Sequence, residues 1–295
     1  MIEIPDQAPS SSATGLTLIR IAGPDRTEFL QGQLTQDVRL CTPDQPMLAG
    51  WPNAKGRLQC LAWLLNWQDT AWLLLPGTLA AAVTKRLSLY VLRSNVSVEV
   101  APADVSFARP NSEVISNISD SGHCFYNDKF YSFQPISGDS RWLQIRLAES
   151  TDPDPEATTP WRLANINAGL PTVYPETAER FVPQMVNLDL LDGISFTKGC
   201  YIGQEIVART QNLGRIKRRM YRWTAAYPTA PGAPIYAAGR SAGEVVDAVN
   251  QDGSTPLLAV ARIESLGHSL SLDPAGAQPL RRERLPYPVP ETLDV

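Results

Sequence analysis

The chain changes character near residue 216, and this change constrains its fold more than any other feature. Beyond that point, short apolar runs are separated by glycine and proline, as at Pro231-Gly232 and Asp252-Gly253. Such punctuation is typical of a small β-barrel. We therefore assign residues 216–295 to a C-terminal barrel that ends in an extended proline-rich tail. The predicted strands are Met220–Ala226, Ile235–Ala238, Gly243–Val249 and Leu257–Ile263.

Residues 1–100 instead alternate between strands and two helices, which predicts an α+β module, ferredoxin-like in arrangement. Two apolar runs joined at 66–69 are a predicted hairpin. A second helix is expected to begin at Pro76-Gly77. The predicted strands are Leu16–Ile21, Leu58–Leu65, Ala71–Leu75 and Val96–Val100.

The first helix of this module is predicted to begin near Pro24 and to run for about four turns, because apolar residues recur at helical spacing from Phe29 to Val38. Its other side carries polar residues. We interpret that side as a solvated helix face. The polar residues are Gln31, Gln33, Thr35 and Asp37.

The pattern weakens over residues 101–215, which we assign to a second α+β module, partly interleaved with the first. Trp142–Leu147 is a predicted strand that returns to the first module. The acidic, proline-rich residues 150–156 are a predicted linker. A short helix, Trp161–Ala168, is expected to end at Gly169. At 295 residues, two or three packed modules are expected.

Composition narrows the function classes. The formal net charge of −4 argues against nucleic-acid binding through bulk charge. We find no signal peptide, and no apolar run of about 18 residues that would span a membrane. Four scattered cysteines lack the paired spacing of a metal site. A cytoplasmic protein with reduced thiols and no metal site is the expectation.

Lys198–Glu205, here called the signature segment, carries the densest chemistry. It places the thiol of Cys200 two residues after Lys198 and just before a helix-forming run from Gln204 to Thr210. A cation and a helix N-terminus both favour a thiolate. We predict an exposed, reactive Cys200 activated by Lys198; the alternative is a buried structural thiol. Such a thiolate can attack a one-carbon unit, hold persulfide sulfur or ligate iron transiently.

The signature segment matches K-G-C-Y-x-G-Q-E at every specified position, and on this motif the chain resembles the YgfZ family of folate-binding proteins, relatives of the glycine-cleavage aminomethyltransferase. Supporting matches follow in the family's order across residues 16–265. They are Phe29–Asp37, Lys55-Gly56-Arg57, Ala168–Pro171 and Ser195-Phe196.

The resemblance implies a ring of three modules, two α+β modules and a barrel, around a central hole that binds tetrahydrofolate or a derivative. It also implies an accessory role in assembling or repairing iron–sulfur enzymes. These client enzymes include some that modify tRNA, so the effect on tRNA would be indirect. The alternative activity is a tetrahydrofolate-dependent one-carbon transferase.

Cys200 and Lys198 are the candidate catalytic residues, and we expect the Cys200 thiol to be partly exposed, with a lowered pKa, beside the folate cavity in the central hole. Lys55 and Arg57 suit the carboxylates of a folate tail, unless they are simply solvated turn residues. Gln204 and Glu205 have a structural alternative, in which they cap the helix or pair with Arg209. The candidate folate-binding residues are Asn167, Lys55, Arg57, Tyr201, Gln204 and Glu205.

Two departures from the aminomethyltransferase pattern weigh against transferase activity. Gln59-Cys60 stands where those enzymes carry an acidic pair, so the electrostatic control of the folate's reacting nitrogen is lost. Asn167 replaces a glutamate of many relatives, and its carboxamide offers one acceptor oxygen and two donors where a carboxylate accepts two hydrogen bonds from a pterin edge. This departure predicts folate binding that is weaker or differently oriented.

The basic cluster Arg215, Lys217, Arg218 and Arg219 leaves a third possibility. We interpret it as a solvated edge of a strand or turn. Direct contact with RNA or an acidic partner is the alternative, and it predicts binding that weakens steeply with salt.

Overall fold

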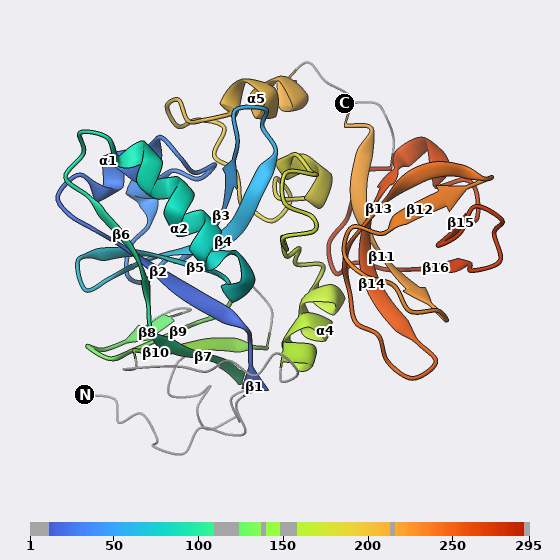
Figure 1. The fold of residues 1–295 in the computed structure, drawn as a ribbon, viewed down its shortest axis with the longest axis horizontal. Coiled ribbons are helices and arrows are strands. Elements are labelled where there is room, and N and C mark those ends of the chain that lie inside the picture. The colour runs from blue at the N-terminus through green and yellow to red at the C-terminus, as the bar shows by residue number, and fades with distance from the viewer. Residues whose placement is uncertain (1–11, 109–123, 137–139, 148–157, 213–215, 292–295) are drawn as a thin grey trace.

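The computed structural model describes residues 12–108, 124–136, 140–147, 158–212 and 216–291. Their strands form three antiparallel sheets. The first two lie together in one body, and the third forms a second body beside it (Figure 1). The irregular chain between α4 (Thr159–Ala168) and α5 (Gln204–Asn212) runs between the two bodies.

The first sheet confirms the ferredoxin-like prediction. Its strand order is β3-β4-β5-β2-β6, with α1 following β2 and α2 following β5. Without edge strand β3, this is a four-stranded sheet with two crossover helices. The β4–β5 hairpin turns at Gln68 and Asp69, whose φ angles of 56° and 50° suit a type I′ turn. The elements are β2 (Leu16–Ala22), α1 (Arg26–Gln31), η1 (Val38–Leu40), β3 (Met47–Pro52), β4 (Leu58–Trp67), β5 (Thr70–Pro76), α2 (Gly77–Val91) and β6 (Ser97–Ala101).

The predicted four-turn helix from Pro24 to Val38 is too long. Helix α1 ends at Gln31, and residues 32–37, here called the α1 loop, continue as irregular chain. The supposedly solvated side chains of Gln31, Gln33 and Thr35 are buried. Their polar groups find partners inside the protein. Thr35 Oγ1, for example, donates to the carbonyl of Gly193 and accepts from the amide of Gly50.

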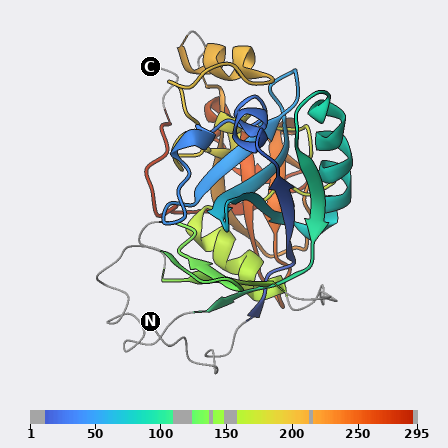
Figure 2. The ribbon, with the colours of Figure 1, turned by 90° about the vertical axis from the view of Figure 1, so that its left-hand side faces the viewer.

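The second sheet stacks on the first (Figure 2). Its order is β1-β7-β10-β9-β8. The strand predicted at Trp142–Leu147 exists as β10, but its assignment to the first module is wrong, because it pairs with β7 and β9. The linker predicted at 150–156 lies outside the described residues. The other strands are β1 (Ser12–Ala13), β7 (Ala103–Ala108), β8 (Cys124–Tyr126) and β9 (Phe130–Phe133).

The third sheet is the predicted barrel. Six strands in the order β15-β12-β13-β14-β11-β16 curl until an isolated bridge between Ser271 and Pro279 links the two edges. The four strands predicted from sequence are present, and two short edge strands were not predicted. The strands are β11 (Arg218–Ala225), β12 (Pro234–Ala237), β13 (Arg240–Ala248), β14 (Thr255–Arg262), β15 (Leu270–Ser271) and β16 (Leu280–Glu283), with η4 (Ile263–Ser265) after β14.

The chain between α4 and α5 holds the two bodies together. Helix α4 ends as predicted at Gly169, whose φ of 67° is left-handed. A Cβ there would lie 2.5 Å from Leu285 and 2.8 Å from the Tyr287 ring. Glycine is therefore also needed because the C-terminal tail packs closely against this residue. One hydrophobic core extends from the first sheet through Phe181, Val186 and Leu188 to the barrel. The division of the chain at residues 100 and 215 stays a prediction.

Candidate functional site

Lys198 anchors the signature segment to the protein. Its side chain is buried, and Nζ donates to the carbonyl oxygens of Gln31, Leu34 and Gln36 at 2.8, 2.7 and 2.7 Å. Three acceptors match the three N–H groups of an ammonium ion. The α1 loop therefore forms a cage of carbonyls around Lys198.

The backbone on either side of Lys198 is fixed to the same loop. The amide of Ser195 donates to the Thr35 carbonyl at 2.9 Å, and the amide of Ile202 donates to the Gly32 carbonyl at 3.1 Å. These bonds explain why α1 stops early. The carbonyls that a longer helix would use internally are instead turned toward residues 195–202.

Burial lowers the pKa of the Lys198 ammonium to about 8, so the group is still charged at neutral pH. Its Nζ also lies 5.0 Å from the ring centre of Tyr201, a cation–π contact. Tyr201 is itself buried, which raises the pKa of its phenol. Both side chains point into the protein.

Cys200 lies between these two inward-facing residues but is exposed. A Cβ added at neighbouring Gly199 would meet no atom within 4 Å, so solvent surrounds this part of the segment. Cys41, Cys60 and Cys124 are buried, and burial raises the pKa of each thiol to about 12. Among the four cysteines, Cys200 is therefore the accessible one. The structure directs Lys198 toward the α1 loop and shows no contact with the thiol of Cys200, whose activation by Lys198 stays a prediction.

The turn at residues 53–57 packs against the end of the signature segment. A Cβ on Gly203 would lie 2.2 Å from the Asn53 carbonyl oxygen, and one on Gly56 would lie 2.7 Å from Cβ of Ile206. The Asn53 side chain holds the turn by accepting from the amides of Lys55 and Arg57. Lys55 and Arg57 are thus brought beside the start of α5.

The predicted folate-binding residues of this turn and helix differ in their surroundings. Lys55 and Glu205 are exposed, and Gln204 is half-buried. Arg57 is exposed but donates to the Arg180 carbonyl. The alternative in which Glu205 pairs with Arg209 is not seen, since no ion pair joins these two residues among those the structure describes. Asn167 lies elsewhere, on α4, where Arg222 of β11 donates to its carbonyl and side-chain oxygens at 3.2 and 3.4 Å. Helices α4 and α5 are well separated in both views (Figures 1 and 2).

Gln59 falls where the β3–β4 register shifts. Its side chain is 5 % exposed, and Nε2 donates to the Pro52 carbonyl, but Oε1 has no partner among the described residues. Two residues further on, Leu61 and Trp63 line a narrow pocket of about 30 Å³ with Trp161 and Leu170. This pocket is mostly apolar and lies between the first sheet and the α4 segment, and Gln59 is not among its lining residues.

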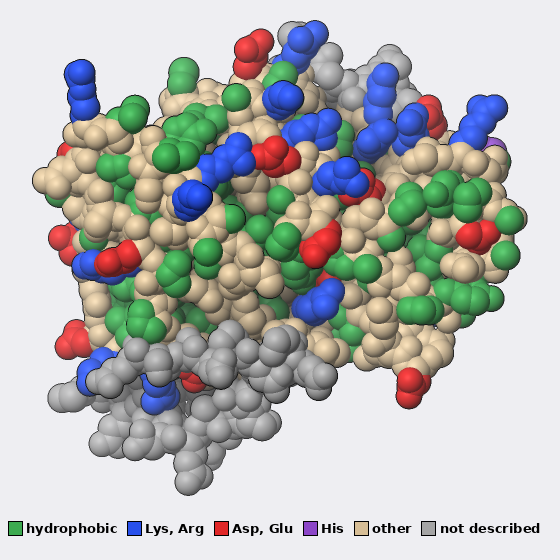
Figure 3. Space-filling model, in the orientation of Figure 1, with side chains coloured by type: hydrophobic (Ala, Val, Ile, Leu, Met, Phe, Trp, Pro, Cys, Tyr) green, Lys and Arg blue, Asp and Glu red, His purple; other side chains and the backbone are tan. Residues whose placement is uncertain are grey.

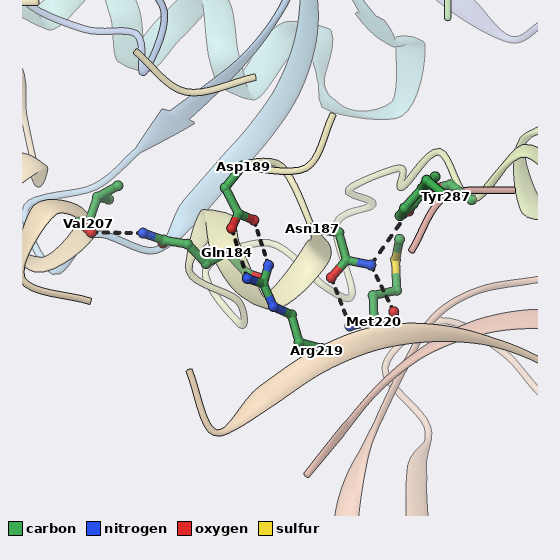
Figure 4. A network of polar contacts seen from close by, with 8 residues as sticks. Gln184, Asn187, Asp189, Val207, Arg219, Met220 and Tyr287 are labelled. Carbon is green, nitrogen blue, oxygen red and sulfur yellow. Dashed lines mark hydrogen bonds and ion pairs between the residues drawn. The ribbon is translucent and has the colours of Figure 1, made fainter. Parts of the chain in front are cut away.

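A network of polar contacts connects α5 to the barrel, as Figure 4 shows. Arg219 binds both carboxylate oxygens of Asp189, at 2.6 and 2.8 Å, and donates to the Gln184 carbonyl. Gln184 in turn donates to the carbonyl of Val207 in α5. The interpretation of Arg219 as solvated is wrong, since it is 4 % exposed. Arg215 of the same basic cluster lies outside the described residues. The available signal in the sequence was the acid Asp189, which lies between Leu188 and Leu190.

No helix in the described ranges is both long and apolar enough to cross a membrane. No group of three or more His, Cys, Asp or Glu side chains suited to a metal ion occurs among the residues that the structure describes.

The fold is that of the aminomethyltransferases. Glycine cleavage system aminomethyltransferase T from Bartonella henselae matches 93% of this chain with a TM-score of 0.64, and 84% of that protein is covered. The two sequences are 16% identical, so this likeness concerns the fold. The predicted α+β arrangement with a C-terminal barrel is thereby confirmed.

Sequence similarity identifies the family. The tRNA-modifying protein YgfZ of Aliivibrio fischeri strain MJ11 is 31% identical over 279 residues, 86% of each chain. Its namesake in strain ES114 is 32% identical over 263 residues, 82% of this chain and 81% of that one. An uncharacterized protein of Haemophilus influenzae is 30% identical over 251 residues, 82% of this chain and 85% of that one. The chain belongs to the YgfZ family. A scan against models of protein families gave no match.

Proposed function

We propose that this protein has a folate-dependent role in tRNA modification, as an accessory factor for iron–sulfur enzymes. Two comparisons support the proposal: the relatives bear the name tRNA-modifying protein, and the fold is shared with an aminomethyltransferase. The observation that carries it is the signature segment. Its lysine is buried in a carbonyl cage while its cysteine faces solvent.

The pocket between the first sheet and α4 is the candidate site for the pterin ring of a folate. Trp63, Trp161 and Leu170 supply apolar surface for a planar ring. With about 30 Å³, the pocket does not enclose a pterin, so its walls must separate for one to enter. Asn167 and the cationic pair Lys55 and Arg57 are the further candidates, for the ring edge and the glutamate tail.

Cys200 is the residue through which the protein acts on its client. An exposed thiol at a fixed place can accept sulfane sulfur or ligate iron for a short time. An iron–sulfur cluster normally has four protein ligands, so one thiolate does not hold it. The client must therefore supply the other ligands. When bound, a reduced folate supplies one-carbon or electron-donating chemistry. This chain contributes the binding surface and the thiol.

A transferase activity is less well supported. Gln59 and Cys60 are buried and uncharged where aminomethyltransferases resembling this chain carry acids, so no carboxylate at these positions can assist the folate nitrogen. The fold alone does not decide the activity.

Titration with tetrahydrofolate and 5-formyltetrahydrofolate, followed by tryptophan fluorescence, tests the cofactor. We expect quenching because Trp63 and Trp161 line the pocket. Trp63→Leu should weaken binding, because it removes apolar surface from the pocket. Cys200→Ser should bind folate normally yet fail to restore client-enzyme activity in cells that lack the protein. No folate binding by the wild type would overturn the cofactor assignment. One-carbon transfer at catalytic rates would favour the transferase instead.

A further inference from the structure

A second cavity lies between α5 and the barrel, away from the narrow pocket beside Trp63 that we propose for folate. Its volume is about 450 Å³, in the range of small-ligand sites. It is bounded by η3 (Pro183–Val186), by α5, and by the ends of β11 and β14. It shares no lining residue with the narrow pocket beside Trp63.

Three cations line this cavity: Lys217, Arg218 and Arg262. Glu264 also lines it and pairs with Arg262 at 3.4 Å, with both side chains partly exposed. Lys217 and Arg218 have no ion-pair partner among the described residues. The lining therefore carries a net charge of about +2, although the whole chain is acidic. Figure 3 shows Lys and Arg side chains gathered over α5 and the adjoining end of the barrel.

A buried acceptor adds a second, independent observation. Gln184 lines the cavity and is fully buried. Its Nε2 donates to the Val207 carbonyl at 2.8 Å, which fixes the orientation of the amide, while Oε1 has no partner among the described residues. Arg219 also binds the Gln184 carbonyl (Figure 4). A rigid, unsatisfied acceptor calls for an N–H or O–H donor.

The rest of the wall is apolar and comes from Val182, Met185, Ile206 and Ile216. A ligand that matches this lining needs a dianionic group for the cations, a flat apolar body for the apolar wall and a hydrogen-bond donor for Gln184. Arginine forks suit phosphate oxygens, and a net charge of +2 suits a phosphate monoester better than a single carboxylate. A nucleotide has all three features, with its base supplying the flat body and the N–H donor.

We propose that the cavity between α5 and the barrel binds a nucleotide unit, with the phosphate on Lys217, Arg218 and Arg262 and the base near Gln184. The same chemistry has two sources, a free nucleoside monophosphate or a nucleotide within an RNA strand. The site is separate from the proposed folate pocket and does not depend on it.

Isothermal titration with AMP, CMP, GMP and UMP, with adenosine, with inorganic phosphate and with a single-stranded RNA decamer tests the proposal. We expect at least one mononucleotide to bind at least tenfold more tightly than adenosine or phosphate, and binding to weaken with salt. A decamer that binds more tightly than any mononucleotide identifies the strand as the source. Equal affinities identify the free nucleotide.

Charge variants give the matched controls. The double variant Lys217→Gln with Arg218→Gln should lose at least tenfold in affinity, whereas Arg240→Gln, which removes an exposed cation from β13, should not. Glu264→Gln should bind more tightly, because it removes the competing carboxylate. Circular dichroism and thermal unfolding verify that each variant is folded.

Three results would overturn the assignment. One is a wild-type protein that binds neither a mononucleotide nor RNA at about millimolar ligand. Another is unchanged affinity in the folded double variant. The third is displacement of the nucleotide by tetrahydrofolate, which would make the two cavities one site. Folate binding without nucleotide binding would refute this inference alone.

Discussion

Gly203 lies directly against Gly56, and the fit depends on both residues lacking a side chain. A Cβ on Gly203 would be 3.0 Å from Cα and N of Gly56 and 2.2 Å from the Asn53 oxygen. Both glycines have positive φ, 78° and 67°. The contact joins the turn at 53–57 to the signature segment, so Lys55 and Arg57 are positioned by the same backbone as α5.

We therefore expect Gly203→Ala to destabilise the protein by at least about 2 kcal/mol, since it combines a left-handed backbone with a clash against backbone atoms. Urea unfolding measures the loss. Gly199→Ala is the matched control within the same segment, because a Cβ there meets nothing within 4 Å, and it should change stability by less than about 0.5 kcal/mol. Equal effects of the two substitutions would show that the close approach is not important.

Lys198→Met should cost roughly 3 kcal/mol or more. It leaves the carbonyls of Gln31, Leu34 and Gln36 without their shared donor in a buried place, and each unsatisfied group costs about 1–3 kcal/mol. Lys55→Met removes an equal charge from an exposed turn and should be nearly neutral. Unfolding by urea compares the two variants. A near-neutral Lys198→Met would contradict the anchoring role.

The buried ammonium also predicts a pH dependence. The pKa of Lys198 is lowered to about 8, against an ordinary value of 10.5. Between these values the unfolded chain holds a proton that the folded chain has lost. Raising the pH therefore favours folding, by up to about 1.4 kcal/mol per pH unit. Wild type should gain stability relative to Lys198→Met between pH 8 and 10, and Lys55→Met should run parallel to wild type. A side-chain resonance of Lys198 with a midpoint near pH 10.5 would refute this prediction.

Cys200 should be the one thiol of the native protein that reacts readily with iodoacetamide. The other three cysteines are buried with thiol pKa values of about 12, so their thiolate fraction at pH 8 is only about 10⁻⁴. Mass spectrometry should find one adduct on the native chain and four after denaturation. Cys200→Ser should abolish the native adduct. A second native adduct would show that one of the buried thiols becomes accessible.

The sequence was informative wherever a residue determines its own local conformation. The hairpin connection within residues 66–69, the end of α4 at Gly169 and the helix-forming run from Gln204 were all predicted from local sequence. The division of the signature segment into inward and outward residues was not. It depends on the α1 loop, more than 150 residues away, whose carbonyls surround Lys198. For the same reason α1 was predicted too long: Thr35 bonds to Gly193, a partner that no local pattern reveals.

The attachment of α4 to the barrel gives a last prediction. Asp247 of β13 is fully buried and accepts from Arg162 at 2.6 and 3.2 Å and from the Tyr174 hydroxyl at 2.9 Å. Arg162→Met leaves Asp247 buried without its partner and should cost about 3–5 kcal/mol. Asp247→Leu should cost less, because the Arg162 side chain is 29 % exposed and can reach solvent.

The double variant Arg162→Met with Asp247→Leu should be more stable than either single variant, because no unpaired charge remains. Tyr174→Phe removes one neutral donor and should cost only about 1–2 kcal/mol. A double-mutant cycle from urea unfolding measures the coupling. Strictly additive losses would mean that the carboxylate and the guanidinium contribute independently, and that the two bodies are held by the apolar core around Val186 and Leu188 instead.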